Sequence, residues 1–260
     1  MSTLAQAINS GVAASRPVAG IPGRLYFATD TGKIFWDNGT AWIDVTPTGS
    51  GGTVPNWVTK SPDTPPATPT AYDDEFDAPS LNTSLWTWNN QENATAVQSN
   101  SRLILTSGTA TNFSSNAILQ PLPTAPWAFT CEAVCEYWGQ PRHVGMVLYE
   151  TSTTKFVTLS IDPSGYPAYI YAQYGTGLAN NTTDIGYSVQ SYPIRGHLRF
   201  RYTSPTLYWD FSVTGAGWGN LYSEAVTTHF TTAPDKVGLF TQGALTYQVV
   251  STFDWFRRTA

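Results

Sequence analysis

The sequence carries little charge. Only 12% of its 260 residues are Asp, Glu, Lys or Arg, whereas 14% are Phe, Trp or Tyr. Four of the 13 basic residues are lysines, and the formal net charge at pH 7 is −5. Because nucleic acid phosphates are bound by surfaces rich in Lys and Arg, we expect no nucleic acid partner.

Long apolar runs are missing as well. No stretch approaches the ~20 apolar residues of a transmembrane helix, so we expect no membrane insertion. The first 15 residues contain no basic residue and no apolar core of signal-peptide length, which predicts synthesis in the cytoplasm without a signal peptide. Residues 1–19 are expected to form an N-terminal tail, and the helical spacing of Leu4, Ile8 and Val12 favours a short helix there.

Cysteine is equally scarce, with Cys131 and Cys135 as the only two. Strand residues four apart are separated by about 13 Å. A disulfide needs Cα atoms about 4.4–6.8 Å apart. We therefore predict that the two cysteines are buried free thiols.

Residues 46–70 hold six prolines and three glycines among Thr and Ser, which predicts a linker without regular structure. Residues 20–45, ahead of it, alternate apolar and polar side chains in three short runs. The turn sequences Thr-Asp-Thr-Gly and Asn38-Gly39 separate these runs, which predicts a small β meander. Three short strands bury little surface alone, so their exposed aromatic residues imply packing against another chain.

The motif GRLYFATDTGKIFWDNGTAW, residues 23–42, resembles the short β module of tailed-bacteriophage fibre, collar and appendage proteins. The alternative is an ordinary small β hairpin. The resemblance implies that residues 20–45 attach the chain to other virion proteins and form a homotrimer. The predicted oligomerisation residues are Tyr26, Phe27, Ile34, Phe35, Trp36 and Trp42.

Residues 71–260 alternate short β-branched and aromatic runs with Gly, Pro, Asn and Ser turns. This pattern predicts an all-β protein in which a C-terminal antiparallel β-sandwich (jelly roll) follows the meander. The opening YDDEFDAPSLNTSLWTWNN and the closing STFDWFRR resemble the two ends of the concanavalin A-like lectin/glucanase superfamily, which includes laminin G-like domains. The resemblance implies two packed sheets that bind, and in some members hydrolyse, carbohydrate.

Glu132 and Glu136 are the first candidates for hydrolysis. Both lie on the polar face of the predicted strand, so we expect them to be solvated. Their Cα atoms would be ~13 Å apart, wider than the about 5–9.5 Å between glycosidase carboxyl groups. The Glu-x-Asp-x-x-Glu motif of the superfamily's laminarinases is also missing. The three histidines are scattered, without metal-ligand spacing. We therefore expect a protein that is not an enzyme.

Carbohydrate binding has better candidates. Sugar rings stack on aromatic side chains while polar groups bond their hydroxyls. The segment YPAYIYAQYG is the densest source of both, although tyrosine also suits a half-buried strand without any ligand. The candidate residues are Tyr166, Tyr169, Tyr171, Gln173 and Tyr174.

Calcium is the candidate cofactor, because the superfamily resemblance implies a structural ion between the first segment and the last strand. Asp74 or Glu75, with Asp254, stand at matching positions and offer oxygen ligands. The alternative is that Asp254 caps the strand edge.

Together these features predict a bacteriophage virion protein, located on the particle, whose jelly roll adheres to host-surface carbohydrate. Two alternatives remain: a glycoside hydrolase or depolymerase of the same fold, and a purely structural decoration protein. Turnover of a host polysaccharide would distinguish the first, and failure to bind any glycan would favour the second.

Overall fold

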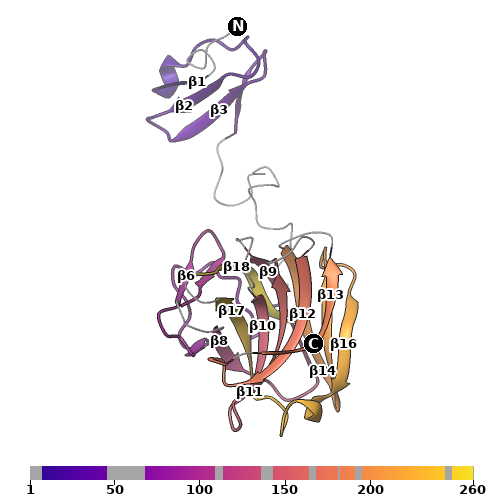
Figure 1. Ribbon diagram of the computed structural model, residues 1–260. Helices are drawn as coiled ribbons and strands as arrows, with labels where there is room; N and C mark the ends of the chain where they lie inside the picture. Colours follow the sequence, from indigo (N-terminus) through magenta and orange to yellow (C-terminus); the bar gives the residue numbers. More distant parts are fainter. Residues whose placement is uncertain are drawn as a thin grey trace. The chain divides into compact units, whose positions relative to one another are not determined.

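The computed structural model describes residues 8–45, 68–108, 114–135, 143–163, 168–180, 182–190, 195–243 and 248–259. The chain divides into two compact units, residues 1–63 and 64–260 (Figure 1). Both are built from β-strands, so the all-β prediction is confirmed. In the described part of the chain, no helix is long and apolar enough to cross a membrane. Nearly all of the predicted linker lies outside the described residues.

The N-terminal unit is a four-stranded sheet in the order β1-β2-β3-β4. β1 lies parallel to β2, and the other pairs are antiparallel. Residues 8–11 form a strand here, not the expected helix, because pairing with the edge of β2 outweighs their helical spacing. The one helical turn among the described residues of this unit is η1 (Ala13–Ser15). The strands are β1 (Ile8–Gly11), β2 (Leu25–Ala28), β3 (Lys33–Asp37) and β4 (Trp42–Asp44).

One face of this small sheet is covered by the segment between β1 and β2. The Tyr26 hydroxyl donates a hydrogen bond to the Val12 carbonyl over 2.9 Å. The Trp42 indole donates to the Pro17 carbonyl over 2.6 Å. The Arg16 guanidinium lies 3.9 Å from the centre of the Phe35 ring, a favourable cation–π contact. These contacts give the unit a small core of its own.

Asp37 holds the same segment through its carboxylate. It accepts hydrogen bonds from the backbone N–H groups of Gly20, Ile21 and Gly39 and from the Arg24 guanidinium. Burial alone would raise the pKa of Asp37, but the hydrogen bonds from Arg24 and the backbone outweigh it. The pKa of Asp37 therefore lies below its ordinary value.

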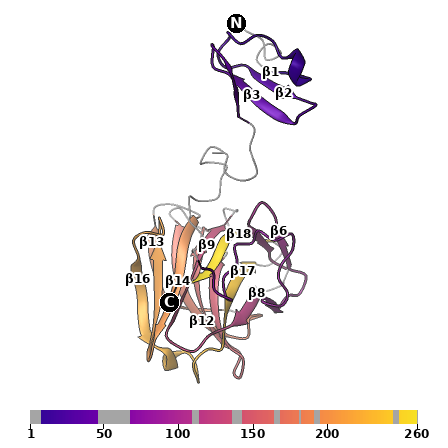
Figure 2. The ribbon, with the colours of Figure 1, turned by 180° about the vertical axis from the view of Figure 1, so that it is seen from behind.

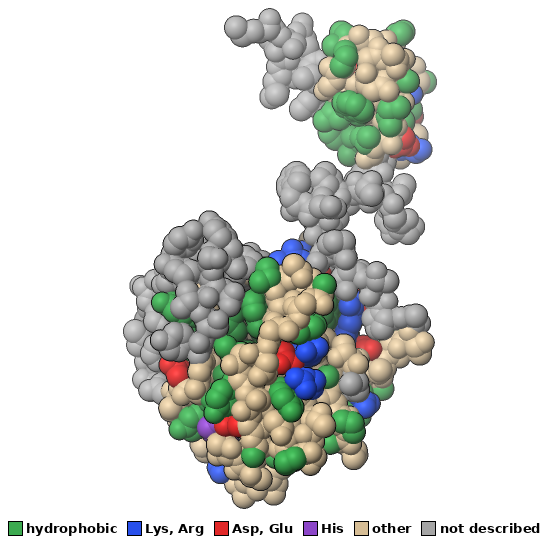
Figure 3. All heavy atoms as spheres, turned by 90° about the vertical axis from the view of Figure 1, so that its right-hand side faces the viewer, with side chains coloured by type: hydrophobic (Ala, Val, Ile, Leu, Met, Phe, Trp, Pro, Cys, Tyr) green, Lys and Arg blue, Asp and Glu red, His purple; other side chains and the backbone are tan. Residues whose placement is uncertain are grey.

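The opposite face of the N-terminal sheet is apolar and open. Register places its residues side by side, with Trp36 between Leu25 and Ile43, and Phe27 opposite Ile34. Phe27, Trp36 and Ile43 are 38%, 42% and 41% exposed. Figure 3 shows hydrophobic side chains gathered on this unit. We call these five residues the apolar face.

The C-terminal unit consists of two seven-stranded sheets with antiparallel pairing throughout the described strands. Figures 1 and 2 show the two sheets from opposite sides. The β10 sheet has the order β13 (Thr183–Gln190), β12 (Ala168–Thr176), β11 (Lys155–Asp162), β10 (His143–Glu150), β17 (Lys236–Gly243), β8 (Ser114–Pro121) and β5 (Thr87–Asn89). The β14 sheet has the order β16 (Gly219–Ala225), β15 (Thr206–Ser212), β14 (Arg195–Thr203), β9 (Trp127–Cys135), β18 (Val250–Arg258), β7 (Leu103–Thr106) and β6 (Thr95–Gln98). A short helical turn, η2 (Val226–Thr228), follows β16.

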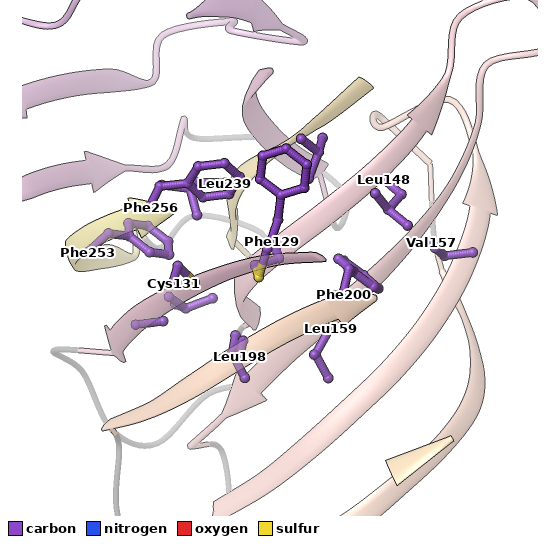
Figure 4. Close-up of a cluster of buried hydrophobic side chains, with 14 of the residues drawn as sticks. Phe129, Cys131, Leu148, Val157, Leu159, Leu198, Phe200, Leu239, Phe253 and Phe256 are labelled. Atoms are coloured by element: carbon purple, nitrogen blue, oxygen red, sulfur yellow. The ribbon is translucent and has the colours of Figure 1, made fainter. Parts of the chain in front are cut away.

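Alternate residues of both sheets meet in one hydrophobic core (Figure 4). The rings of Phe129 and Phe256 stack with their centres 5.4 Å apart. Cys131 and Cys135 are buried there as free cysteines, as predicted. Burial raises the pKa of the Cys131 thiol, and the nearby Glu132 carboxylate raises it further. This thiol therefore behaves as a small apolar side chain.

Candidate functional site

The β10 sheet has a second face that points away from the core. Val144, Met146 and Leu148 of β10 lie in the core, so the residues between them point outward. The same alternation runs through the neighbouring strands and defines an outer face that is apolar at one end and polar at the other.

The apolar half is covered by the chain itself. It consists of Ala117, Leu119, Val147, Tyr149, Phe156 and Phe240, and Leu178 packs on it. Leu178 lies in the β12–β13 connection, and its carbonyl accepts a hydrogen bond from the Ser115 N–H on β8 over 2.8 Å. Gly177, at φ +71°, makes the turn that starts this crossing. This half of the face is thus closed by a second small core.

The polar half lies at the other end of the same strands. His143 opens β10, and its Nδ1 is 3.2 Å from the Ser160 hydroxyl of β11. Its ring meets the Tyr171 ring edge-on, with centres 5.3 Å apart. The polar half comprises His143, Thr158, Ser160, Asp162, Tyr169, Tyr171, Gln173 and Asp184.

His143 is held in its neutral form. Burial lowers the pKa of the imidazole below its ordinary value, although the carboxylates of Asp162 and Asp184 act in the opposite direction. A neutral imidazole can donate one hydrogen bond and accept another. The polar half therefore offers mixed donors and acceptors around one ring.

The structure places the predicted binding residues on two different faces. Tyr169, Tyr171 and Gln173 belong to the polar half, and the two tyrosine rings lie 5.7 Å apart. Tyr174 lies on the opposite face of β12, where it is the register partner of Val157, and it stacks on His229 with ring centres 4.3 Å apart. Tyr166 lies outside the described residues.

The strand alternation correctly turns Glu132 away from the core, but the expected solvation is wrong. Glu132 is 1% exposed and forms an ion pair with Arg195. It faces outward from the β14 sheet, where His197 is its partner in register. A carboxylate so deeply buried requires a paired cation. Glu136 lies outside the described residues.

The predicted calcium ligands are bound by other groups of the protein. Asp74 pairs with Phe256 through the backbone and accepts a hydrogen bond from the Trp86 indole over 2.8 Å. Burial raises the pKa of Asp74. Glu75 binds Arg257 over 2.6 and 2.7 Å.

Asp254 binds Arg102 over 3.3 Å. Among the described residues no group of three or more His, Cys, Asp or Glu side chains could hold a metal. These contacts do not favour an ion, and calcium binding stays an untested prediction.

The predicted oligomerisation residues lie on two opposite faces of the N-terminal sheet. Phe27, Ile34 and Trp36 belong to the apolar face. Tyr26, Phe35 and Trp42 lie on the other side, where the segment before β2 covers them.

Several residues of the polar half were missed from the sequence. His143 was set aside as scattered, and Ser160, Asp162 and Asp184 were not singled out. The segment Lys155–Asp162 alternates apolar and polar residues and stands shortly before the tyrosine-rich strand in the sequence. Pairing these two strands as a hairpin would have placed Thr158 and Ser160 beside Gln173 and Tyr171.

The comparisons with known proteins were made on sequence and on structure. No protein-family model matches the chain, and no curated protein matches it. Solved structures do match. The GH43 protein BlXynB from Bacillus licheniformis gives a TM-score of 0.60 at 13% identity, covering 90% of this chain and 52% of that one. This chain thus spans about half of BlXynB.

Two shorter proteins match over nearly their whole length. The catalytic domain of an endo-1,3-beta-glucanase (laminarinase) from Thermotoga petrophila gives a TM-score of 0.53 at 7% identity, covering 72% of this chain and 95% of that one. The Bacillus licheniformis β-glucanase gives 0.51 at 13% identity, covering 73% and 97%. At such identities the likeness shows the fold alone, a β-sandwich.

These matches overturn the prediction that the chain is not an enzyme. That prediction rested on the wide separation of Glu132 and Glu136, the missing motif and the scattered histidines, whereas the matched structures are glycoside hydrolases by name. Glycoside hydrolysis usually needs two carboxyl groups at a suitable separation, which different spacings in a sequence can provide. The missing motif therefore does not exclude hydrolysis.

Proposed function

We propose that the C-terminal unit is a carbohydrate-active domain that takes its glycan at the polar half of the outer face. The observation that carries this proposal is the grouping of two tyrosine rings with a neutral imidazole, hydroxyls, an amide and two carboxylates. Aromatic rings receive the C–H faces of sugars, and the polar groups bond the hydroxyls. The hydrolases that share the fold support the same class of ligand.

Binding is tested with the full chain on polysaccharide affinity gels that contain xylan, laminarin or mixed-linkage β-glucan. Tyr171→Ala should weaken retention about tenfold, because it removes a stacking surface worth about 1.4 kcal/mol. Tyr208→Ala is the matched control, since Tyr208 lies on the outer face of the β14 sheet under Arg201. The proposal fails if the wild-type chain binds none of these glycans.

Hydrolysis at the same place is the second candidate function. It is favoured by Asp162 and Asp184, two carboxylates that both act on the imidazole of His143. Release of reducing ends from the bound polysaccharide would demonstrate turnover. Asp162→Asn and Asp184→Asn should then each abolish turnover while leaving retention on the gel. A chain that binds but releases no reducing ends removes this candidate and keeps the first.

The N-terminal unit extends the proposal to a bacteriophage particle. The fibre-like motif of residues 23–42 and the apolar face support a role in attachment to other virion proteins and in assembly of a homotrimer. Three copies would present three glycan sites, and weak sites gain avidity when linked. The corresponding role is adhesion to host-surface carbohydrate, and purely structural decoration is the alternative.

Oligomerisation is tested by light scattering on the full chain. Trp36→Ser combined with Phe27→Ser should convert a trimer to a monomer, because it removes the two aromatic rings of the apolar face. Val97→Ser is the control, as Val97 is 53% exposed on the C-terminal unit. A wild-type monomer, or a double variant that stays trimeric, would contradict the assignment.

A further inference from the structure

Two side chains in the polar half each have one polar atom without a hydrogen-bond partner among the described residues. Thr158 on β11 and Gln173 on β12 are directly opposite each other in register. Thr158 is fully buried and Gln173 is 5% exposed. Neither the Thr158 hydroxyl nor the Gln173 carbonyl oxygen has a partner among the described residues. The two unmet groups are therefore neighbours on one face.

Such a pair is costly in a protein that binds nothing there. A buried polar atom without a partner has lost its bonds to water and gained none in return. Most buried polar groups are paired for this reason. Two adjacent exceptions on the same face point to a ligand that supplies the missing bonds.

Gln173 connects the pair to an exposed residue. The Gln173 amide nitrogen donates to the Asp184 carboxylate over 2.8 Å. Asp184 is exposed, and Tyr171 beside it is partly exposed. This hydrogen bond fixes the amide so that its carbonyl oxygen, an acceptor only, is the atom left unmet. A ligand that enters past Asp184 would reach it.

We propose that Thr158 and Gln173 form a subsite that binds one uncharged sugar hydroxyl of the glycan. The inference rests on the proposed function. A hydroxyl can donate to the Gln173 carbonyl oxygen and at the same time accept a hydrogen bond from the Thr158 hydroxyl. Both unmet atoms are then satisfied by a single group, with Tyr171 beside it as the stacking surface.

The same geometry selects against acidic sugars. A carboxylate only accepts hydrogen bonds, so it would face the Gln173 carbonyl oxygen without a proton to offer, close to the Asp184 carboxylate. The described residues of the polar half include no Lys or Arg to offset that repulsion, and burial keeps His143 neutral. The substrate class is therefore a neutral glycan.

The test measures glycan retention and thermal unfolding of the full chain in parallel. The probes are xylan and laminarin as neutral polymers and polygalacturonate as an acidic one. Thr158→Val keeps the side-chain shape, and Gln173→Met keeps its length. Thr130→Val is the matched control, because Thr130 is a buried strand threonine on the outer face of the other sheet, bonded to the Arg257 carbonyl.

We expect Thr158→Val and Gln173→Met each to weaken retention on a neutral polymer about fivefold, the loss of one neutral hydrogen bond. Thr158→Val should not lower the melting temperature, since it removes a hydroxyl that is unpaired in the free protein. Thr130→Val should leave retention unchanged.

Three results would overturn the inference. Unchanged retention with a lowered melting temperature for Thr158→Val would make the hydroxyl structural, and the proposed function would stand. Tighter binding of polygalacturonate than of both neutral polymers would reverse the substrate class. No binding of any probe by the wild-type chain would overturn the inference and the proposed function together.

Discussion

The two outer faces of the sandwich differ in the kind of polar group that they bury. On the β14 sheet, the Asp210 carboxylate accepts hydrogen bonds from Arg199 over 2.9 Å and Arg201 over 3.1 Å. Glu132 pairs with Arg195 on the same face. On the β10 sheet, the polar half contains hydroxyls, an amide and a neutral imidazole, and two of its buried polar atoms lack partners.

This contrast separates a stabilising surface from a site. On the β14 sheet the buried carboxylates of Glu132 and Asp210 are neutralised by arginines of the same sheet. Unmet groups beside partly exposed tyrosines leave hydrogen-bonding capacity that a ligand can use. Figure 3 shows basic and acidic side chains in contact on the C-terminal unit.

The largest effect is expected when a paired carboxylate is removed from the outer face of the β14 sheet. Asp210→Ala leaves the Arg199 and Arg201 guanidiniums without their carboxylate and should lower the free energy of unfolding by about 3 kcal/mol. Asp184→Ala on the other face should cost about 0.5 kcal/mol, because Asp184 is exposed. Urea denaturation of both variants measures the difference. Equal losses would mean that the two faces do not differ as described.

The next effect concerns the covered half of the β10 face. Leu178→Ala should lower the free energy of unfolding by about 2–3 kcal/mol, since Leu178 is 2% exposed and packs on the apolar half. Glycan retention should stay unchanged if the two halves act independently. Loss of retention at full stability would show that they are coupled.

The third effect is a pH dependence. The pKa of His143 is lowered in the folded state. At a pH above the pKa of histidine in the unfolded chain, about 6.5, this shift has no effect on stability. As pH falls below that value the unfolded chain binds a proton more readily than the folded one, so the free energy of unfolding decreases. His143→Gln should flatten this loss, by about 1.4 kcal/mol per pH unit at most. Unfolding free energies at pH 7.5 and 5.5 provide the measurement.

His229 requires a control in the same experiment. Burial lowers the pKa of His229 too, with the Lys155 charge acting in the same direction. His229→Gln should therefore remove a separate share of the slope. If His143→Gln does not change how the free energy of unfolding depends on pH, the assignment of a neutral imidazole at the site is wrong.

The smallest effect is expected from removing a hydroxyl that contacts the His143 imidazole. Ser160→Ala removes the hydroxyl next to His143 Nδ1 and should cost about 0.5–1 kcal/mol. Ser223→Ala on exposed β16 should cost nothing measurable. If neither variant changes the free energy of unfolding, the Ser160 hydroxyl does not stabilise the His143 imidazole.

The strands and the core were predictable from local alternation, because one buried face per strand repeats every second residue. The placement of Phe129, Cys131 and Cys135 in the core follows from that pattern. The outer face was harder, since its residues are buried too. His143 and Ser160 are distant in sequence and meet only when β10 pairs with β11.

Local patterns also could not reveal which partners a buried charge would find. Glu132 is predicted correctly to point outward, but its ion pair with Arg195 depends on β14 lying beside β9. Alternation alone places Tyr174 on the opposite face from Tyr171, but its stacking on His229 depends on tertiary contacts.

The carboxylate of Asp37 sets how the two units respond to acid. Its folded-state pKa lies below the ordinary value, so its contribution is present above that value and is lost only as pH falls through the lowered pKa. His143 and His229, by contrast, begin to destabilise the sandwich as soon as pH falls below about 6.5. In mild acid the Asp37 contribution to the smaller sheet is therefore retained, whereas the two histidines of the sandwich already lower its stability.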